Sequence, residues 1–335
     1  MNAARLDALA RSLTGPFAFC GIGLAQGGHT HLAIATAPGI SAGPDTMFRV
    51  ASISKIVVGQ AVAAFVKTKA TTWQTEISDI LGWRLRNPEF SDTPITLGMV
   101  ASHSAGLTDE AGYVLPPDAV LAEWCAAQPI HRHQPGTYFS YSNLDYLILA
   151  AALEKLSGQP FPDAVSHLLP ERAGFNWVGI DSADRLPTYR RDDSGFVAQI
   201  DDTIAPVPEG SHPGVYSPQG GLRLSLKGML ALAQGLRNAD ATPLWTPAMG
   251  PGEYEGGVFE SYGAGLQIFN TPNFYPRPLI GHFGNAYGFR GGVWYDRERD
   301  LSFAYALNGL AVGDEDDAFS DAELQICAVL ADWKG

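Results

Sequence analysis

The pattern of hydrophobic and polar residues predicts a helix, a hairpin and a second helix in the first part of the chain. Leucines at helical spacing place an amphipathic helix within residues 1–15. Two apolar runs, 18–25 and 29–35, are joined by a Gly-Gly pair, which is typical of a β-hairpin. After a loop rich in Gly and Pro, about ten apolar residues behind Ser52 predict a buried helix.

The middle of the chain has mainly helical periods, from about residue 85 to residue 200. Leu144, Leu147 and Ile148 recur at helical spacing, and Gly158 follows as a helix end. Pro-rich loops separate the helical segments, so we expect short helices there.

Strand patterns return beyond Pro206, at 262–269, 291–296 and 301–308. A final helix is expected over roughly 315–333. Because strands are predicted near both ends of the chain, both ends would contribute to one sheet.

Composition narrows the class of partner. The chain has 335 residues, of which 46% are hydrophobic, and can bury a substantial core. The formal net charge is −13, from 35 acidic and 22 basic residues, and no basic run occurs. A nucleic-acid or anionic-membrane partner therefore has no electrostatic support. We expect small, neutral or mixed-charge substrates.

The sequence also bears on the compartment. Its beginning has no apolar segment of the secretion-signal type, and the apolar run 17–25 is too short to cross a membrane. Cys20, Cys125 and Cys327 are odd in number and widely spaced, which suggests neither a metal nor a disulfide framework. We expect a reducing, cytoplasmic location, although a shortened chain from the periplasm would have the same sequence.

Ser52 and Lys55 stand one helical turn apart at the start of the segment FRVASISKIVVGQAVAAFV. This spacing puts an amine near a hydroxyl at the helix end where backbone N–H groups are unpaired. A serine hydroxyl reacts at neutral pH only when a base takes its proton, and a partly buried lysine with a lowered pKa can do so. The alternative is a capping serine with a lysine that extends into solvent.

A second cluster, Tyr141-Ser142-Asn143, directly precedes a predicted helix. As structure, Ser142 or Asn143 is a helix cap. As chemistry, a phenolate stabilised by a nearby ammonium is a general base, and an asparagine amide can hold both a lysine and a substrate carbonyl.

A third cluster is GHFGNAYGFRGG, in which five glycines flank His282. Glycine lets the backbone approach a ligand closely, and backbone N–H groups at a strand edge can stabilise an oxyanion. A lone histidine is more often structural.

Three further motifs carry less weight. The G-x-S-x-G pattern at 39–43 lies between two prolines, so it lacks the strand and helix that a nucleophile elbow needs. His131 and His133 have no accompanying metal-ligand set and fit a polar loop. The acidic cluster 314–317 lacks the spacing of a calcium loop, so we expect no metal.

Together the three clusters resemble the serine β-lactamase and penicillin-binding protein superfamily. The similarity is to its class C-like branch, which includes DD-peptidases, D-aminopeptidases, amidases and esterases. It covers nearly the whole chain, with support from TPITLGMVASHSAGL (93–107), YSPQGGLRLSLKGMLALAQGL (216–236) and the stretch 281–308.

The resemblance implies a role for each residue of the three clusters. Ser52 matches the acylated nucleophile, Lys55 the base one turn later, and Tyr141 and Asn143 the Tyr-x-Asn element. His282 and Gly284 belong to the third motif. The oxyanion hole would be the backbone N–H groups of Ser52 and Asn285, and a water near Tyr141 would release the acyl group. Whether Lys55 or Tyr141 takes the first proton stays open.

One departure from the family affects the expected substrate. His282 stands where β-lactamases usually have the lysine of Lys-Thr-Gly, which weakens the fixed positive charge for a substrate carboxylate. We therefore expect a serine hydrolase of small esters or amides that acts through an acyl-enzyme without a cofactor. The alternatives are a β-lactamase or DD-carboxypeptidase, an acyltransferase, and a non-catalytic binding module of the same fold.

The expected fold is α+β, an antiparallel sheet flanked by helices with an inserted, mainly helical domain. Residues 1–85 and 205–335 would form the sheet domain and 86–204 the helical domain, with the active site in the cleft between them. Tyr216, Tyr287 and Phe289 are candidate substrate-binding residues at the rim, and ordinary packing is the alternative for each.

Overall fold

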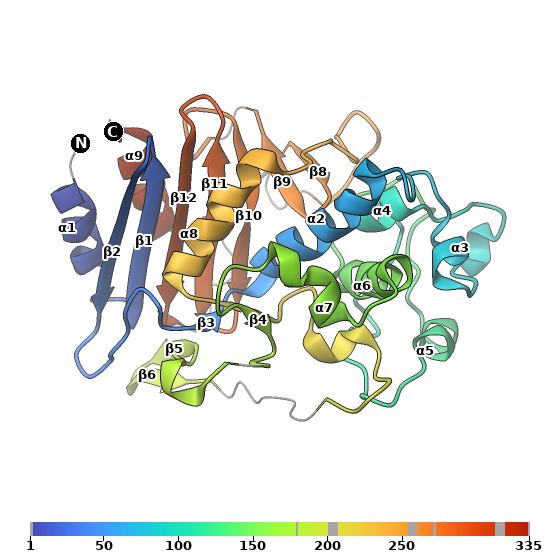
Figure 1. Ribbon diagram of the computed structural model, residues 1–335, viewed down its shortest axis with the longest axis horizontal. Coiled ribbons are helices and arrows are strands. Elements are labelled where there is room, and N and C mark those ends of the chain that lie inside the picture. Colours follow the sequence, from blue (N-terminus) through green and yellow to red (C-terminus); the bar gives the residue numbers. More distant parts are fainter. Residues whose placement is uncertain are drawn as a thin grey trace.

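The computed structural model describes residues 3–178, 180–199, 207–253, 260–270, 273–311 and 319–333. At its centre is a seven-stranded sheet in the order β2-β1-β12-β11-β10-β9-β8, antiparallel at every pairing (Figure 1). Its strands are β1 (Phe19–Gln26), β2 (His29–Thr36), β8 (Ser261–Gly263), β9 (Leu266–Phe269), β10 (Leu279–Ala286), β11 (Phe289–Asp296) and β12 (Leu301–Asn308). The pairing of β1 with β12 joins the two ends of the chain, which confirms that both contribute to one sheet.

Helices cover both faces of this sheet. Helix α8 (Leu226–Gly235) crosses β1, β12 and β11 on one face (Figure 1), where glycines of β1 give it room. A Cβ atom added at Gly21 would lie 3.0 Å from the side chain of Leu226. Helices α1 (Ala3–Leu13) and α9 (Asp321–Ala331) cover the other face, where Tyr305 of β12 donates its O–H to Glu323 of α9. Strand β12 is buried along its whole length because both of its faces are covered.

A group of helices packs beside the sheet around α6, which contacts α2, α3, α4 and α7 (Figure 1). The group consists of α2 (Ser54–Lys67), α3 (Ile77–Leu81), α4 (Leu97–Ala101), α5 (Leu121–Ala127), α6 (Asn143–Ser157) and α7 (Phe161–Val165). Ten consecutive residues of α6 are buried, from Leu144 to Leu153. The helix ends at Gly158, as predicted, with the left-handed conformation that glycine adopts without strain (φ 68°).

Short elements connect these parts. Two small three-stranded sheets have the orders β3-β7-β4 and β13-β5-β6. Their strands are β3 (Phe48–Arg49), β4 (Gly174–Phe175), β5 (Tyr189–Asp192), β6 (Gly195–Ala198), β7 (Leu222–Leu224) and β13 (Leu310–Ala311). The 3-10 helices are η1 (Ala51–Ile53), η2 (Pro88–Phe90), η3 (Ser166–Leu168), η4 (Ser182–Asp184), η5 (Pro213–Tyr216) and η6 (Leu236–Asn238).

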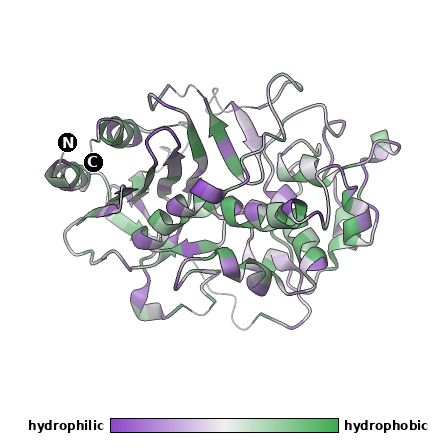
Figure 2. Cartoon of the chain, turned by 45° about the horizontal axis from the view of Figure 1, so that its top comes forward, coloured by the Kyte–Doolittle hydropathy of each residue, from purple (hydrophilic) through white to green (hydrophobic). Residues whose placement is uncertain are grey.

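Hydrophobic residues follow the strands of the sheet and the helices that pack beside it (Figure 2). Cys20, Cys125 and Cys327 are buried free thiols within this core. Among the described helices, none is long and apolar enough to span a bilayer. The expected cytoplasmic location stays a prediction.

The α+β fold is confirmed, and two element predictions need correction. The segment 262–269 is not one strand but two, because Ala264 and Gly265, both with positive φ, form a tight turn between β8 and β9. The final helix begins at Asp321, where Ser320 and Glu323 form a capping box. The acidic cluster 314–317 lies outside the described residues.

The predicted division of the chain into two domains stays a prediction. Helices α4 to α7 lie within residues 86–204, as expected. The same region also contains the strands β4, β5 and β6, so its last part is not helical. The helical character of 86–204 thus holds as far as η3.

Candidate active site

Ser52 lies in the 3-10 turn η1, directly between strand β3 and helix α2. The prediction placed it in the helix itself, whereas α2 begins two residues later. Ala51, the residue before it, has a φ of 49°, a conformation that costs free energy in a residue with a side chain. Ser54 stabilises this turn, since its hydroxyl donates to the Ala51 carbonyl (2.6 Å) and accepts from the Leu222 N–H (3.0 Å).

Lys55 is fully buried, and its amine meets three oxygen atoms. The Nζ atom donates to Ser52 Oγ (3.1 Å), to Asn143 Oδ1 (2.8 Å) and to the Gln219 carbonyl (3.1 Å). An amide oxygen can only accept, whereas a hydroxyl can also donate. After losing one proton, the amine can therefore keep both amide contacts and turn its lone pair toward the Ser52 hydroxyl. This geometry suits a base.

Tyr141 and Asn143 come to the same amine from the start of α6. The Lys55 Nζ lies 4.6 Å from the centre of the Tyr141 ring, where an ammonium is attracted by the ring face. Asn143 accepts from Lys55 and donates its own Nδ2–H to Asp109 (2.9 Å). The structure thus brings four predicted residues together from two distant parts of the chain.

Asp109 is a site residue that the sequence analysis missed. Its carboxylate accepts from the Ser142 hydroxyl and from the backbone N–H groups of Asn143 and Leu144, at 2.7 to 3.0 Å, besides the Asn143 side chain. Ser142 is the N-cap residue of α6, as expected, but its side chain makes no capping hydrogen bond, and the Asp109 carboxylate accepts from the N–H groups instead. A carboxylate at this end also complements the helix dipole. Asp109 lies 34 residues before Asn143, and no local spacing signals the contact.

The third motif forms strand β10, which passes closely beside the Ser52 turn. A Cβ atom at Gly284 would lie 2.4 Å from the Val50 carbonyl oxygen, so only glycine permits this approach. Strand β10 pairs with β11 over its full length but with β9 only over Leu279–Gly281. Residues 282–286 therefore lie at a local edge of the sheet, as the sequence analysis expected.

The direction of the backbone at this edge follows from the β10–β11 hairpin. Both residues of its turn, 287–288, have positive φ, which is typical of a two-residue hairpin turn. In such a hairpin the flanking pair, Ala286 and Phe289, is hydrogen-bonded, and the next pair, Asn285 and Arg290, is not. Asn285 therefore points its N–H away from β11. Phe283 alternates in the same way and donates its N–H to Gln267 of β9 (3.2 Å). This orientation agrees with an oxyanion hole between the N–H groups of Ser52 and Asn285, which stays a prediction.

His282 is fully buried, and both of its ring nitrogens meet other groups of the protein. Its Nδ1 lies 2.5 Å from the Phe283 carbonyl, which can only accept, so Nδ1 is the protonated nitrogen. Its Nε2 then accepts from the Tyr262 hydroxyl (3.1 Å). Burial, with a smaller effect of the Lys55 charge, lowers the pKa of His282 to about 3. The imidazole is neutral and offers no cation to a substrate carboxylate.

The three rim candidates fall in different environments. Tyr287 is 40% exposed at the β10–β11 turn, and the Arg49 guanidinium lies 3.9 Å from its ring centre. Tyr216 packs against Phe161 of α7. Phe289 is fully buried against Phe48 in the core, so its placement at the rim is wrong. Its apolar side chain faces inward because both faces of β11 are covered.

The remaining motifs are accounted for by structure. The G-x-S-x-G pattern at 39–43 lies in a loop, as predicted. His133 stacks on Tyr138 with ring centres 4.0 Å apart. Within the described parts of the chain, no group of three or more His, Cys, Asp or Glu residues is placed to hold a metal ion.

Comparison with known families places this geometry in context. A family model described as Beta-lactamase matches residues 21–326, a range that includes every residue of the candidate site. Among solved structures, the beta-lactamase/D-alanine carboxypeptidase from Yersinia pestis complexed with citrate is similar with a TM-score of 0.74 and 15% identity. The match covers 98% of this chain and 99% of that chain, so the two share a fold.

Two curated relatives match part of the sequence. D-alanyl-D-alanine-carboxypeptidase/endopeptidase AmpH of Escherichia coli (strain K12) is 25% identical over 199 residues, which cover 55% of this chain and 50% of that protein. Esterase EstB of Burkholderia gladioli is 27% identical over 215 residues, which cover 53% of each protein. The chain thus spans about half the length of these curated relatives.

Proposed function

The chain belongs to the Beta-lactamase family, and on this premise we propose that it is a serine hydrolase that cleaves ester or amide bonds in small substrates. The observation that carries the proposal is the contact between the buried Lys55 amine and the Ser52 hydroxyl, 3.1 Å away. Nucleophilic catalysis by serine requires a base at this distance.

The proposed reaction has two steps. The Ser52 Oγ bonds to the substrate carbonyl carbon while its proton passes to Lys55 or Tyr141. The N–H groups of Ser52 and Asn285 stabilise the resulting oxyanion. Collapse of the intermediate breaks the bond to the leaving alcohol or amine, which takes up the proton, and leaves an acyl ester on Ser52. Water then attacks this ester and releases the carboxylic acid.

The neutral charge of His282 favours substrates that place no carboxylate group beside the third motif. A neutral imidazole engaged with Tyr262 and the Phe283 carbonyl gives no charge-assisted hydrogen bond to an anion. Simple esters and amides therefore fit this site better than β-lactams, whose carboxylate would lack that partner. The name of the relative Esterase EstB supports the ester, and the name of AmpH keeps a D-alanyl carboxypeptidase as the second candidate.

The test is covalent labelling together with turnover. The purified protein is treated with a fluorophosphonate, its intact mass is measured, and the modified peptide is mapped. Turnover is then measured with p-nitrophenyl acetate, a D-alanyl-D-alanine peptide and nitrocefin. We expect one adduct on Ser52 and the highest kcat/KM for the ester.

Two serine variants make the result specific. Ser52→Ala should lose the adduct and essentially all turnover, whereas Ser41→Ala, in the loop 39–43, should keep both. Turnover by Ser52→Ala within about tenfold of the parent would overturn the assignment. Absence of any adduct on the parent would favour a binding module instead. A new ester formed in the presence of an added alcohol would identify an acyltransferase.

A further inference from the structure

His103 holds the chain on both sides of Tyr141. Its carbonyl accepts from the Ser140 N–H (2.9 Å), and its ring Nδ1 accepts from the Ser142 N–H (3.3 Å). Its imidazole lies against the Tyr141 ring, with ring centres 4.4 Å apart. The residue is 1% exposed and has a φ of 58°, an unusual conformation for a side-chain residue. His103 thus has a strained backbone and hydrogen-bonds both residues next to Tyr141 in the sequence. Such strain beside a catalytic candidate points to a functional constraint.

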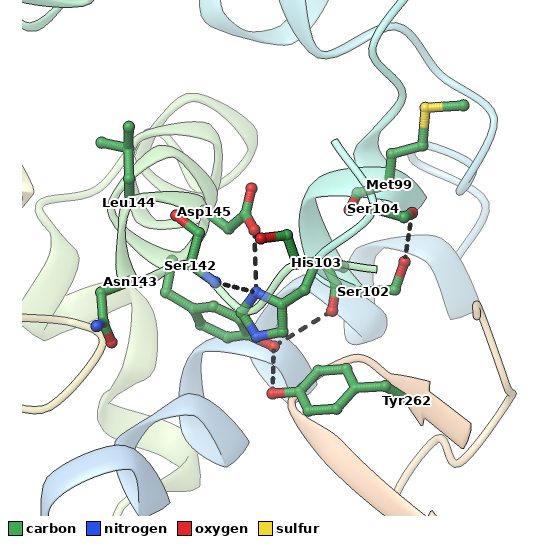
Figure 3. A network of polar contacts seen from close by, with 12 residues as sticks. Met99, Ser102, His103, Ser104, Ser142, Asn143, Leu144, Asp145 and Tyr262 are labelled. Atoms are coloured by element: carbon green, nitrogen blue, oxygen red, sulfur yellow. Dashed lines mark hydrogen bonds and ion pairs between the residues drawn. The ribbon is translucent and has the colours of Figure 1, made fainter. Parts of the chain in front are cut away.

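The same ring nitrogen also meets a buried acid. The Nδ1 of His103 lies 2.9 Å from Oδ2 of Asp145, which is 1% exposed (Figure 3). A nitrogen that accepts the Ser142 N–H carries no proton of its own. The proton in the contact with Asp145 must then belong to the carboxyl group, which donates it to Nδ1. In this state His103 and Asp145 are both neutral, and the imidazole hydrogen is on Nε2, a buried atom that has no hydrogen-bond partner among the described residues.

The charged groups around the pair favour this neutral state. Burial raises the pKa of Asp145 well above its usual range, and the nearby Asp109 charge adds to the effect. Burial lowers the pKa of His103, and the charge of Lys55 acts in the same direction. An imidazolium at His103 would be repelled by the Lys55 ammonium, since both groups contact the Tyr141 ring.

The other neighbours of the imidazole add no charge at neutral pH. Two buried tyrosines, Tyr146 of α6 and Tyr262 of β8, have ring centres 5.2 and 4.8 Å from it. Burial raises the pKa of both phenols, which keeps them protonated. Their hydroxyls lie 3.4 Å apart. Apart from Asp145 itself, these neighbours offer no negative charge that would stabilise a positive His103.

We propose that His103, kept neutral by a proton on Asp145, is the positioning residue for Tyr141 in the hydrolase proposed above. The proposal rests on that function. The Tyr141 ring contacts both the His103 imidazole and the Lys55 amine, and the two N–H groups on either side of Tyr141 are fixed by His103. Moving the proton from Asp145 to Nδ1 would break the Ser142 contact and release the segment.

Four variants distinguish the effect of the Asp145 proton from the effect of the packing of the His103 ring. Asp145→Asn can still donate to Nδ1 but cannot ionise, so kcat/KM should stay within about threefold of the parent with an unchanged pH profile. Asp145→Ala removes the donor, and His103→Asn keeps an acceptor and tolerates positive φ but loses the ring. Both should lower kcat by about 10- to 100-fold with little change in KM, because a displaced catalytic group costs rate. Asp163→Asn, on α7, is the matched control and should match the parent.

A second measurement does not depend on activity. In nitrogen NMR of the ¹⁵N-histidine-labelled protein, His103 should appear as the neutral tautomer protonated at Nε2, without titrating between about pH 5 and 8. The same signal should persist in Asp145→Asn. An imidazolium, or a tautomer protonated at Nδ1, would overturn the proton assignment, and this spectrum decides it even where Asp145→Ala fails to fold.

The two proposals fail in different ways. If the parent shows no fluorophosphonate adduct on Ser52, the proposed function fails, while the NMR result still tests the His103–Asp145 pair. If the parent is labelled and active but His103→Asn keeps its kcat and pH profile, the positioning role fails. Loss of activity in Asp145→Asn with a shifted pH profile would show that an ionised Asp145 is needed. That result would also overturn the proposed role of a neutral His103.

Discussion

The Nζ atom of Lys55 lies 3.1 Å from the Oγ atom of Ser52, although the two residues belong to different local structures. Ser52 sits in a 3-10 turn and Lys55 in the first turn of α2. Lys55 is fully buried, whereas Ser52 is partly exposed. A substrate can therefore reach the hydroxyl while the amine stays shielded from water, and in such a site electrostatic interactions are stronger than in solvent.

Replacing Lys55 tests whether this contact makes the nucleophile reactive. Lys55→Met keeps an unbranched side chain, one atom shorter, and removes the base. We expect kcat/KM for p-nitrophenyl acetate to fall by roughly 10²- to 10⁴-fold, the usual contribution of a general base. Lys67→Met, at the exposed end of the same helix, is the control and should keep parental turnover. Equal rates in the two variants would exclude Lys55 as the base.

Replacing Asp109 tests the cap that positions Asn143. Asp109→Ala removes the acceptor for four hydrogen bonds at the start of α6. We expect the free energy of unfolding to fall by about 2 to 4 kcal/mol, and kcat to fall as well, because buried donors lose their partner. Urea unfolding and ester turnover measure both effects.

The control for this prediction is Asp118→Asn, an exposed aspartate in the same connecting stretch, which should change neither quantity. Unchanged stability of Asp109→Ala would show that water replaces the carboxylate and that the cap is not needed.

Local patterns were enough to predict the central strands and the contact between Ser52 and Lys55. Ser52 and Lys55 are three residues apart, and the spacing that brings them together is a property of the helix turn itself. Strands β1, β2, β11 and β12 were predictable because they carry apolar runs that end at turn residues. The tight turn at Ala264-Gly265 was missed because alanine gives no signal of positive φ.

The supporting contacts could not be predicted because they join residues far apart in the sequence. Lys55 and Gln219 are 164 residues apart, and His103 and Asp145 are 42 apart. No periodicity encodes such pairs; the contact of His103 with Asp145, for example, depends on the packing of α6 against α4. The burial of Phe289 likewise depends on the elements that cover β11, and a glycine-rich segment does not reveal them.

Replacing Gly284 tests the close approach of β10 to the nucleophile. In Gly284→Ala the new Cβ would meet the Val50 carbonyl oxygen at 2.4 Å, so the strand or the Ser52 turn must move. We expect a loss of roughly 10²-fold in kcat, since displacement by about 1 Å is costly in an active site. Gly235→Ala, at the end of α8, meets no atom within 4 Å and should keep full activity with equal or higher stability. Full activity of Gly284→Ala would show that the turn is not fixed by this contact.

The pH dependence of stability tests the neutral state of His282. Its pKa is about 3 in the folded chain and 6.5 in the unfolded chain, so between these values the unfolded state binds the extra proton. His282 therefore contributes a stability term that is constant above about pH 6.5 and decreases as the pH falls toward 3. At pH 5 the expected loss is about 2 kcal/mol relative to pH 7.

In the same pH range, His103 and Asp145 change the free energy of unfolding in opposite directions. A variant of His282 is therefore needed to isolate its own contribution. The lowered pKa of His103 makes stability rise with pH, whereas the raised pKa of Asp145 makes it fall, so their slopes oppose each other. In His282→Asn the mean slope of unfolding free energy against pH, measured by urea unfolding between pH 5 and 6.5, should decrease by about 1 kcal/mol per pH unit. The denaturant dependence should stay equal in the two proteins, which shows that they unfold over the same surface. An unchanged slope would mean that His282 takes up its proton in the folded chain, and the site would then contain a cation for substrate carboxylates.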